Sequence, residues 1–287
     1  MKKQQWMENL PLDGITHITS VSGGDVNEAY KIETTSETYF LLVQPQRQAA
    51  FYAAEIAGLE AFEKAGVTAP RVIANGVIDG DAYLVLSYLE EGVQGSQEAL
   101  GKLVAKLHQT ESDNGKFGFH LPYEGGDHRF DNHWTNDWRT LFLKQRIAPL
   151  KTRIASRHLL SEKDLNLLDK VYDIMDQTLC HHDSRPSLLH GDLWAGNYMF
   201  LTDGTPALFD PAPLYGDREF DLGATKVFGG FSETFYEAYN KAYPLKAGAE
   251  FRIHFYILYL LLVHLVKFGT MYESSVRREM ETIVAKA

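Results

Sequence analysis

Apolar and polar residues alternate with a period of two along much of the first ninety residues. The segments with this alternation are residues 15–19, 29–33, 38–43, 71–74 and 82–87. A period of two indicates a strand with one buried face. Between the third and fourth segments, residues 49–65 carry apolar side chains at helical spacing and end at Gly66, a helix stop signal. The pattern predicts a small antiparallel sheet with one helix.

Beyond residue 96 the apolar positions follow a helical period instead. The segments with this spacing are residues 97–109, 135–147, 162–179, 232–242, 250–268 and 275–286. A polar, glycine-bearing segment, 89–96, separates them from the sheet and is typical of a hinge. The chain therefore predicts an α+β, bilobal architecture with an N-terminal lobe of residues 1–89 and a mostly helical C-terminal lobe of residues 90–287. We expect the ligand site in the cleft between them.

Composition narrows the partners and the compartment. The net charge of −10 over 287 residues argues against nucleic acid, which requires clustered Lys and Arg. A single cysteine, Cys180, excludes an intrachain disulfide and fits a reducing compartment. The longest apolar run, residues 255–263, is too short to span a bilayer, and the N-terminus lacks the apolar core of a signal peptide. We expect a cytoplasmic protein without a membrane partner; the composition leaves the oligomeric state open.

Three polar residues have the most informative spacing: Asp192 and Asn197 lie between two apolar runs, 187–189 and 198–201, and Asp210 follows the second run. Asn197 follows Asp192 by five residues, and Asp210 follows Asn197 by thirteen. In phosphoryl transfer, a loop Asp orients the acceptor hydroxyl and takes its proton, while a downstream Asn and Asp hold the metal ions. Carboxylate and amide oxygens suit Mg²⁺. The spacing predicts a phosphotransferase with Asp192 as the base and with Asn197 and Asp210 as metal ligands.

The strings around these residues are more specific than the spacing. Residues 187–197 read Ser-Leu-Leu-His-Gly-Asp-Leu-Trp-Ala-Gly-Asn, and residues 209–212 and 215–222 read Phe-Asp-Pro-Ala and Tyr-Gly-Asp-Arg-Glu-Phe-Asp-Leu. They resemble the fructosamine (ketosamine) kinase family, in the protein-kinase-like and aminoglycoside-phosphotransferase-like superfamily. The resemblance continues through residues 23–27, 132–134, 138 and 144–147, nearly the whole chain. It implies a protein-kinase-like fold that uses ATP and Mg²⁺.

The resemblance also implies roles on the nucleotide side of the cleft. Gly23 and Gly24, in a hairpin-like turn between the first two strands, would cover the phosphates with their backbone N–H groups. Backbone groups of Tyr88, Leu89 and Glu90 would take the adenine. A lone Gly-Gly turn is common, so the first of these signals is weak by itself.

On the acceptor side, the resemblance assigns His190 to bracing the catalytic loop and Asp221 to hydrogen bonding with the loop backbone. Asp217 either binds substrate or caps a helix. Trp134 and Trp138 are four residues apart and would share a face of a helix. Such a pair is more often core, but the aromatic segment lies near the acceptor sugar in the family, so stacking on the sugar is a second hypothesis.

One residue departs from the family pattern. Kinase-like enzymes pair a lysine on the third strand with the nucleotide phosphates and with a glutamate on the next helix. Glu55 fits the glutamate, but counting back thirteen residues, the family interval, ends on Leu42. Either Lys31 or Arg47 reaches the phosphates instead, or the chain is a nucleotide-binding pseudokinase with a regulatory role. The retained Asp192, Asn197 and Asp210 favour an active or slow kinase.

The resulting hypothesis is an ATP- and Mg²⁺-dependent kinase that phosphorylates a ketosamine, such as a fructosamine, ribulosamine or erythrulosamine adduct. The resemblance implies the 3-hydroxyl as the acceptor and protein deglycation as the role. The alternatives are the pseudokinase and another small-molecule kinase, acting on an aminoglycoside, choline or methylthioribose. The strings Trp-Ala-Gly-Asn (194–197) and Gly-Asp-Arg-Glu (216–219) favour the ketosamine branch over the last of these.

Overall fold

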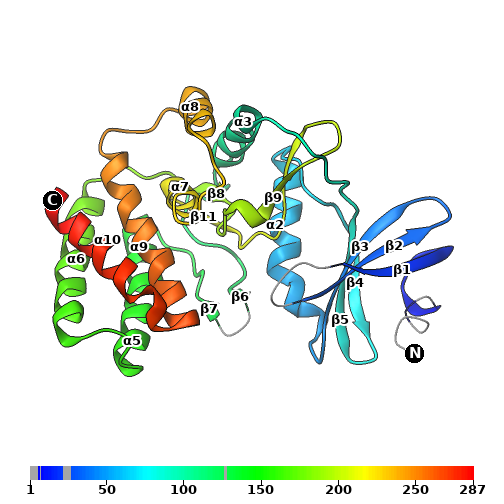
Figure 1. The fold of residues 1–287 in the computed structure, drawn as a ribbon, viewed down its shortest axis with the longest axis horizontal. Helices are drawn as coiled ribbons and strands as arrows, with labels where there is room; N and C mark the ends of the chain where they lie inside the picture. Colours follow the sequence, from blue (N-terminus) through cyan, green and yellow to red (C-terminus); the bar gives the residue numbers. More distant parts are fainter. Residues whose placement is uncertain (1–5, 7, 22–26, 126–127) are drawn as a thin grey trace.

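The computed structural model describes residue 6 and residues 8–21, 27–125 and 128–287. Five antiparallel strands form the sheet of the N-terminal lobe, in the spatial order β1-β2-β3-β5-β4 (Figure 1). Their bounds are β1 Ile15–Val21, β2 Glu28–Thr34, β3 Thr38–Gln44, β4 Val72–Ile78 and β5 Asp81–Ser87. The five-stranded sheet predicted from the alternation is therefore confirmed, with each strand longer than its apolar core by up to three residues.

Helix α2 (Ala53–Lys64), preceded by a 3₁₀ turn at Ala49–Tyr52, lies between the sheet and the other lobe (Figure 1). It packs on one face of the sheet through a cluster that contains Tyr52, Leu59 and Leu84, with Leu42 at its edge. The opposite face is covered by Trp6 and Leu10 and by neighbouring apolar side chains. The sheet is thus covered on both faces, and α2 lies between it and the C-terminal lobe.

The C-terminal lobe is mostly helical and carries the short strands that hold its loops. Its helices are α3 Gln97–His108, α4 Trp138–Phe142, α5 Ala148–Ser156, α6 Glu162–Cys180, α7 Glu219–Thr225, α8 Glu233–Ala242, α9 Ala249–Phe268 and α10 Glu273–Lys286. Three antiparallel pairs accompany them: β6 (Tyr123–Gly125) with β7 (His128–Phe130), β9 (Tyr198–Phe200) with β10 (Pro206–Leu208), and β8 (Ser187–Leu189) with β11 (Leu214–Gly216). The bilobal α+β, kinase-like fold is confirmed.

The helix expected over residues 135–147 begins later and runs further. Asp137 caps α4 by accepting a hydrogen bond from the backbone of Thr140 at 2.8 Å, so the helix starts at Trp138. A π-helical turn, Leu143–Ile147, then joins α4 to α5, which ends at Ser156. Trp134 lies outside this helix, so the expectation that Trp134 and Trp138 share one helical face is wrong.

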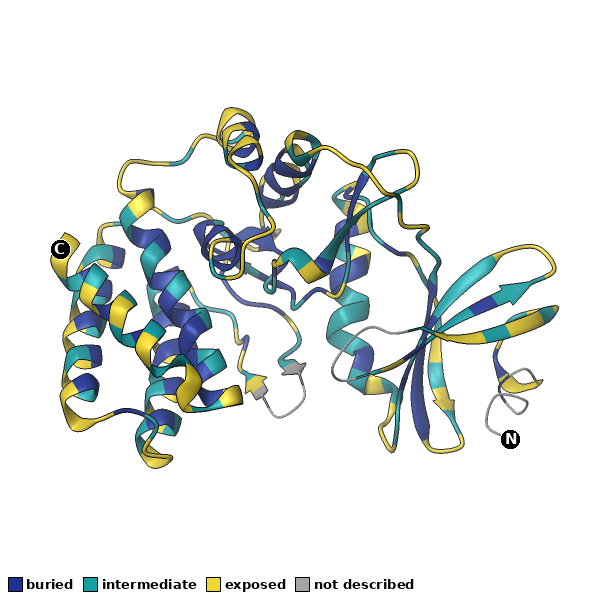
Figure 2. Ribbon diagram, in the orientation of Figure 1, coloured by how far each residue is buried: buried dark blue, intermediate teal, exposed yellow. Residues whose placement is uncertain are grey.

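Helix α9 is the centre of the C-terminal lobe. It has 20 residues, and among the described residues it is long and apolar enough to cross a membrane by length and composition. However, 56% of its most apolar stretch is buried, chiefly by α7 and α10 (Figure 2). The apolar run of nine residues noted in the sequence is the middle of this core helix, and the helix predicted over residues 250–268 is confirmed.

The two lobes are joined by residues 88–96, which pair with the β9–β10 hairpin. The backbone N–H of Gly92 donates to Phe200 at 2.7 Å, and Thr202 donates to the carbonyl of Glu90 at 3.2 Å. A Cβ atom on Gly92 would lie 2.3 Å from the carbonyl oxygen of Leu201, so this close approach requires glycine. The boundary placed at residue 89 falls inside this connection.

Candidate active site

The predicted catalytic loop, residues 190–197, follows β8. Asp221 of α7 forms hydrogen bonds with the backbone of this loop. The Asp221 carboxylate accepts hydrogen bonds from the backbone N–H groups of His190 (2.7 Å) and Gly191 (2.9 Å). The ring of His108 contacts the same carboxylate at 3.0 Å, and both side chains are completely buried. Charged acceptors make stronger hydrogen bonds than neutral ones. Asp221 therefore determines where the loop backbone turns.

Gly191 allows the loop to lie against the segment that follows Asp210. Its φ is +82°, and a Cβ atom there would lie 1.8 Å from the carbonyl oxygen of Ala212. The backbone N–H of Ala212 donates to the carbonyl of His190 at 2.8 Å. Only glycine combines this left-handed conformation with this contact, so the His190-Gly191-Asp192 string has a steric cause.

Asp192, Asn197 and Asp210 are brought together by hydrogen bonds between their segments. The Nδ2 atom of Asn197 donates to the backbone oxygen of Asp192 (2.8 Å) and to its Oδ2 atom (3.2 Å). The carbonyl of Asn197 accepts from the N–H of Phe209 at 3.1 Å, and His190 Nε2 contacts the Phe209 carbonyl at 2.9 Å. Asp210 itself has a φ of +56°. A non-glycine residue in this region is strained, and such strain concentrates at functional sites.

Three carboxyl groups have raised pKa values: that of Glu55 in the N-terminal lobe and those of Asp192 and Asp210 in the C-terminal lobe. Burial, and then the charge of Asp210, raise the pKa of Asp192 to about 6. Burial also raises the pKa of Asp210. Burial and the charge of Asp210 raise the pKa of Glu55, on α2, to about 8. A divalent cation would relieve this repulsion, and the carboxylate of Asp210 with the Oδ1 atom of Asn197 offers the oxygen ligands that Mg²⁺ prefers. The residues therefore fit a magnesium ion.

Leu42 packs as an apolar side chain on the cleft side of the sheet. Its neighbours on β3, Leu41 and Val43, are buried with Trp6 on the opposite face, whereas Leu42 joins the cluster of Tyr52 and Leu59. Lys31 bonds to Glu33 at 3.0 Å, and its Nζ atom lies 5.3 Å from the centre of the Tyr88 ring, at the hinge. Arg47 is exposed, 5.7 Å from the centre of the Phe51 ring. In the described part of the chain, neither cation forms an ion pair with Glu55.

The raised pKa of Glu55 makes the stability of the ligand-free protein depend on pH. Its pKa of about 8 in the folded state exceeds the ordinary value of 4.5, so the folded state binds more protons between these values. Stability should therefore fall as the pH rises from about 5 to 8. We expect Glu55→Gln to remove much of this loss and to raise the melting temperature at pH 8.

Thermal unfolding at pH 6, 7 and 8 measures the effect. Glu60→Gln, at an exposed position on the same helix, is the control and should leave the slope unchanged. An identical pH slope in wild type and Glu55→Gln would show that Glu55 is ionised in the ligand-free protein.

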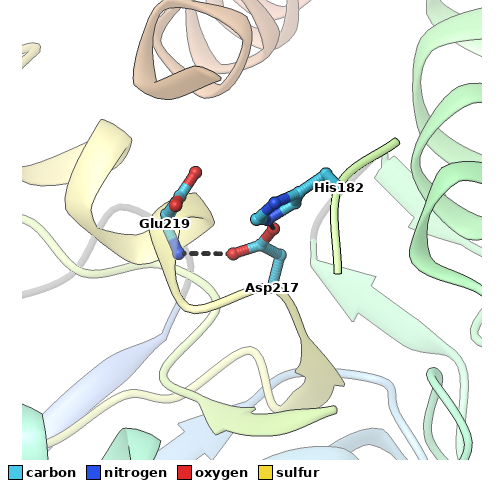
Figure 3. A group of neighbouring side chains, drawn as sticks. All are labelled: His182, Asp217 and Glu219. Atoms are coloured by element: carbon cyan, nitrogen blue, oxygen red, sulfur yellow. Dashed lines mark hydrogen bonds and ion pairs between the residues drawn. The ribbon is translucent and has the colours of Figure 1, made fainter. Parts of the chain in front are cut away.

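Asp217 and His182 belong to a buried network behind the catalytic loop (Figure 3). Asp217 contacts His182 Nε2 at 2.6 Å and accepts from Ser184 (2.8 Å), Tyr256 (3.3 Å) and the backbone of Glu219 (2.9 Å). His182, Asp217 and Glu219 have the spacing of metal ligands, but Arg252 already binds Glu219 with two hydrogen bonds, of 2.7 and 2.8 Å. The carboxylate of Asp217 is therefore engaged by donors of the protein itself. The side chain of His182 is 6% exposed, so it is a buried member of this network.

The two tryptophans have different environments. Trp138 is 2% exposed, and its indole N–H donates to the Tyr256 hydroxyl at 2.9 Å, so we assign it to the core. Trp134 is partly exposed and stacks on Tyr215 with ring centres 6.0 Å apart. Of these two, only Trp134 keeps a face that a sugar could reach.

The residues predicted on the nucleotide side have different outcomes. Gly23 and Gly24 lie outside the described residues, and Tyr88, Leu89 and Glu90 directly follow β5.

Two tyrosines near the acceptor position had no sequence signal. The pKa of Tyr123, on β6, is raised by burial and by the charges of Asp192 and Asp210. The pKa of Tyr259, on α9, is raised to about 12 by burial, with a contribution from Asp192. Both therefore lie near the predicted base. The β6–β7 hairpin has strands of three residues, too short for an alternation pattern.

Comparison with known proteins yields matches over nearly the whole chain. The family model described as fructosamine kinase matches residues 1–286. A "probable ketoamine kinase" of Staphylococcus aureus is 61% identical over 98% of both chains. A chloroplastic protein-ribulosamine 3-kinase of Oryza sativa subsp. indica is 30% identical over 91% of this chain and 77% of that one. The crystal structure of a "putative fructosamine-3-kinase" of Thermobifida fusca is 27% identical, has a TM-score of 0.84 and covers 94% of each chain.

Proposed function

This chain belongs to the fructosamine kinase family, and from that premise we propose that it transfers the γ-phosphoryl group of ATP to a sugar hydroxyl of a ketosamine. The observation that carries the proposal is the junction of Asp192, Asn197 and Asp210. One amide group, that of Asn197, bonds to both the backbone and the carboxylate of Asp192, while the Asn197 carbonyl holds the strand end at Phe209. A base and two metal ligands are thus fixed relative to one another.

In this proposal the ketosamine hydroxyl lies against Asp192. Its oxygen forms a bond to the γ-phosphorus as the bond to the ADP oxygen breaks, and the hydroxyl proton passes to the Asp192 carboxylate. Asn197 and Asp210 would hold Mg²⁺, which neutralises charge on the phosphates. Tyr88, Leu89 and Glu90 would receive the adenine at the hinge, and Glu55 would order the small lobe. Asp221 and His190 keep the loop in place throughout.

The acceptor class follows from the family and the names of its members. Ketoamine kinase and protein-ribulosamine 3-kinase are the names of two relatives, which supports a ketosamine and phosphorylation at its 3-hydroxyl. Fructosamine, ribulosamine and erythrulosamine adducts are the candidates, and removal of early glycation products in the cytoplasm is the proposed role. The retained catalytic set favours this function over a pseudokinase, although Leu42 leaves the phosphates without the strand lysine.

The test is turnover with a defined panel. Purified protein with MgATP should release ADP on ribulosamines or fructosamines, and phosphorus NMR of the product should show one sugar phosphate at the 3-position. Hygromycin B, choline and methylthioribose are the comparison acceptors and should give only background release. ATP binding without turnover on any acceptor would instead support the pseudokinase, and turnover on a comparison acceptor would support another small-molecule kinase.

The rate should depend on pH through Asp192. Because the pKa of Asp192 is raised to about 6, the base is increasingly protonated below that value. We expect kcat/KM at limiting substrate to fall about tenfold per pH unit below pH 6 and to level off above pH 7. Initial rates measured between pH 5 and 8 give the pH dependence of kcat/KM. Doubling the amount of coupling enzyme should leave these rates unchanged, which shows that the kinase step limits them. A flat profile over that range would mean that Asp192 titrates well below its expected value.

A further inference from the structure

Several large apolar side chains are exposed in the described part of the chain. Those of the N-terminal lobe and hinge are Ile73, Val77 and Val93, and those of the C-terminal lobe are Trp194, Phe228, Phe268 and Met271. Phe228 is 44% exposed, Phe268 45% and Met271 75%, although none of them is needed by the catalytic set. Clustered exposed apolar groups on a soluble protein mark interaction sites.

Ring contacts join these side chains into one surface. Phe228 lies 4.8 Å from His264, and His264 lies 5.4 Å from Phe268 and 5.2 Å from Tyr272, measured between ring centres. Phe268 and Tyr272 are 6.1 Å apart. We call Phe228, His264, Phe268 and Tyr272 the aromatic platform. It is formed by the end of α9, the 3₁₀ turn Thr270–Tyr272 and the loop after α7.

The platform is continuous with the active site through that loop. The Tyr198 hydroxyl donates to the carbonyl of Gly230 at 2.5 Å, and a Cβ atom on Gly230 would lie 2.3 Å from Cβ of Ala195. The loop of Phe228 is therefore pressed against the catalytic loop. On the α9 side, Lys267 Nζ lies 4.9 Å from the centre of the Phe268 ring. Burial and the charge of Asp210 raise the pKa of Asp192, and the positive charge of Lys267 opposes part of this rise.

We propose that the aromatic platform binds the carrier of the ketosamine, as an apolar residue next to the glycated lysine of a peptide or protein. This inference rests on the proposed function. With the sugar hydroxyl at Asp192, the amine substituent must leave the acceptor site, and the platform lies beside that site. Aromatic side chains supply contact area at low entropic cost. A second copy of the chain fits less well, because a stable dimer requires about 800 Å² from each partner and the platform is one helix end with one loop residue.

The test compares acceptors that share one ribulosamine-bearing lysine. One peptide carries leucine on both sides of that lysine, a second carries serine, and the third acceptor is the ribulosamine of Nα-acetyl-lysine. We expect the wild type to have a KM about tenfold lower for the leucine peptide than for the other two. Phe228→Ala with Phe268→Ala should remove this difference without changing kcat, the KM for MgATP or the KM for the small acceptor. Ile73→Ala, equally exposed at 45% but on β4, should behave as wild type.

Each outcome decides between the proposals. Turnover with equal KM values for the three acceptors, or a double variant that loses kcat on all of them, overturns the platform inference and leaves the proposed function standing. The absence of turnover on every ketosamine overturns both. A change of oligomeric state in the double variant, measured by size-exclusion chromatography with light scattering, would assign the platform to self-association and overturn the inference. Unchanged melting temperatures confirm that the variants are folded.

Discussion

Replacing Asp192 by asparagine is expected to lower kcat by about a hundred- to ten-thousandfold, the usual contribution of a general base. The amide keeps the size of the side chain and a hydrogen-bonding partner for Asn197, but it cannot accept the hydroxyl proton. The loop should keep its conformation, because Asp221 and Gly191 determine it and neither contact involves the Asp192 side chain.

ADP release with a ketosamine acceptor measures the loss, and titration calorimetry with MgATP measures the binding that should persist. Asp203→Asn, in the exposed turn between β9 and β10, is the matched control and should change kcat less than about twofold. A variant at Asp192 that retains wild-type kcat would remove Asp192 from the role of base.

The second large effect is expected from restoring the strand lysine. We expect Leu42→Lys to raise kcat/KM for ATP by on the order of a hundredfold, the effect of one preorganised charge contact at the reacting group. Leu42 faces α2, and the pKa of Glu55 on that helix is raised to about 8. A lysine at position 42 would pair with Glu55, lower its pKa and present its ammonium group to the phosphates.

Two further variants separate charge from packing. Leu42→Met, which keeps the apolar contact with Tyr52 and Leu59, should leave kcat/KM unchanged. Glu55→Gln combined with Leu42→Lys should lose most of the gain, because the lysine is then no longer held by a carboxylate. If Leu42→Lys brings no gain, another group already contacts the phosphates, and Lys31→Met and Arg47→Met would identify it by a rise in the KM for ATP.

The local chemistry of the catalytic loop was readable from the sequence. Asp192, Asn197 and Asp210 lie close in the chain, and the intervening glycine and apolar runs constrain the backbone strongly enough for spacing to imply geometry. The strands and most helices were predicted for the same reason, since the period of apolar residues reports which face is buried. The absence of a lysine at position 42 is also a purely local fact.

The sequence-based predictions failed where a contact with a residue far away in the chain decided the structure. The two tryptophans were placed on one helix by their spacing, but Asp137 caps that helix after Trp134. The partner of His182 is Asp217, 35 positions further on, and no residue near His182 in the chain indicates it. Tyr123 lies on a short hairpin and Tyr259 on a core helix, and the charge of Asp192 affects the pKa of both. No residue near either tyrosine in the chain indicates that it lies close to Asp192.

The sequence alone determined the family and the two-lobe order of strands and helices, and it predicted which residues act as the base and the metal ligands. These features could be predicted because they depend on residues that are close in the chain or on the period at which apolar residues recur. Tertiary structure alone decided that neither Lys31 nor Arg47 pairs with Glu55 among the described residues, that Lys31 is engaged at the hinge, and that Phe228 and Phe268 form one surface beside the catalytic loop. Charge coupling and exposure depend on distances between segments that are far apart in sequence, and only the packed lobes establish those distances.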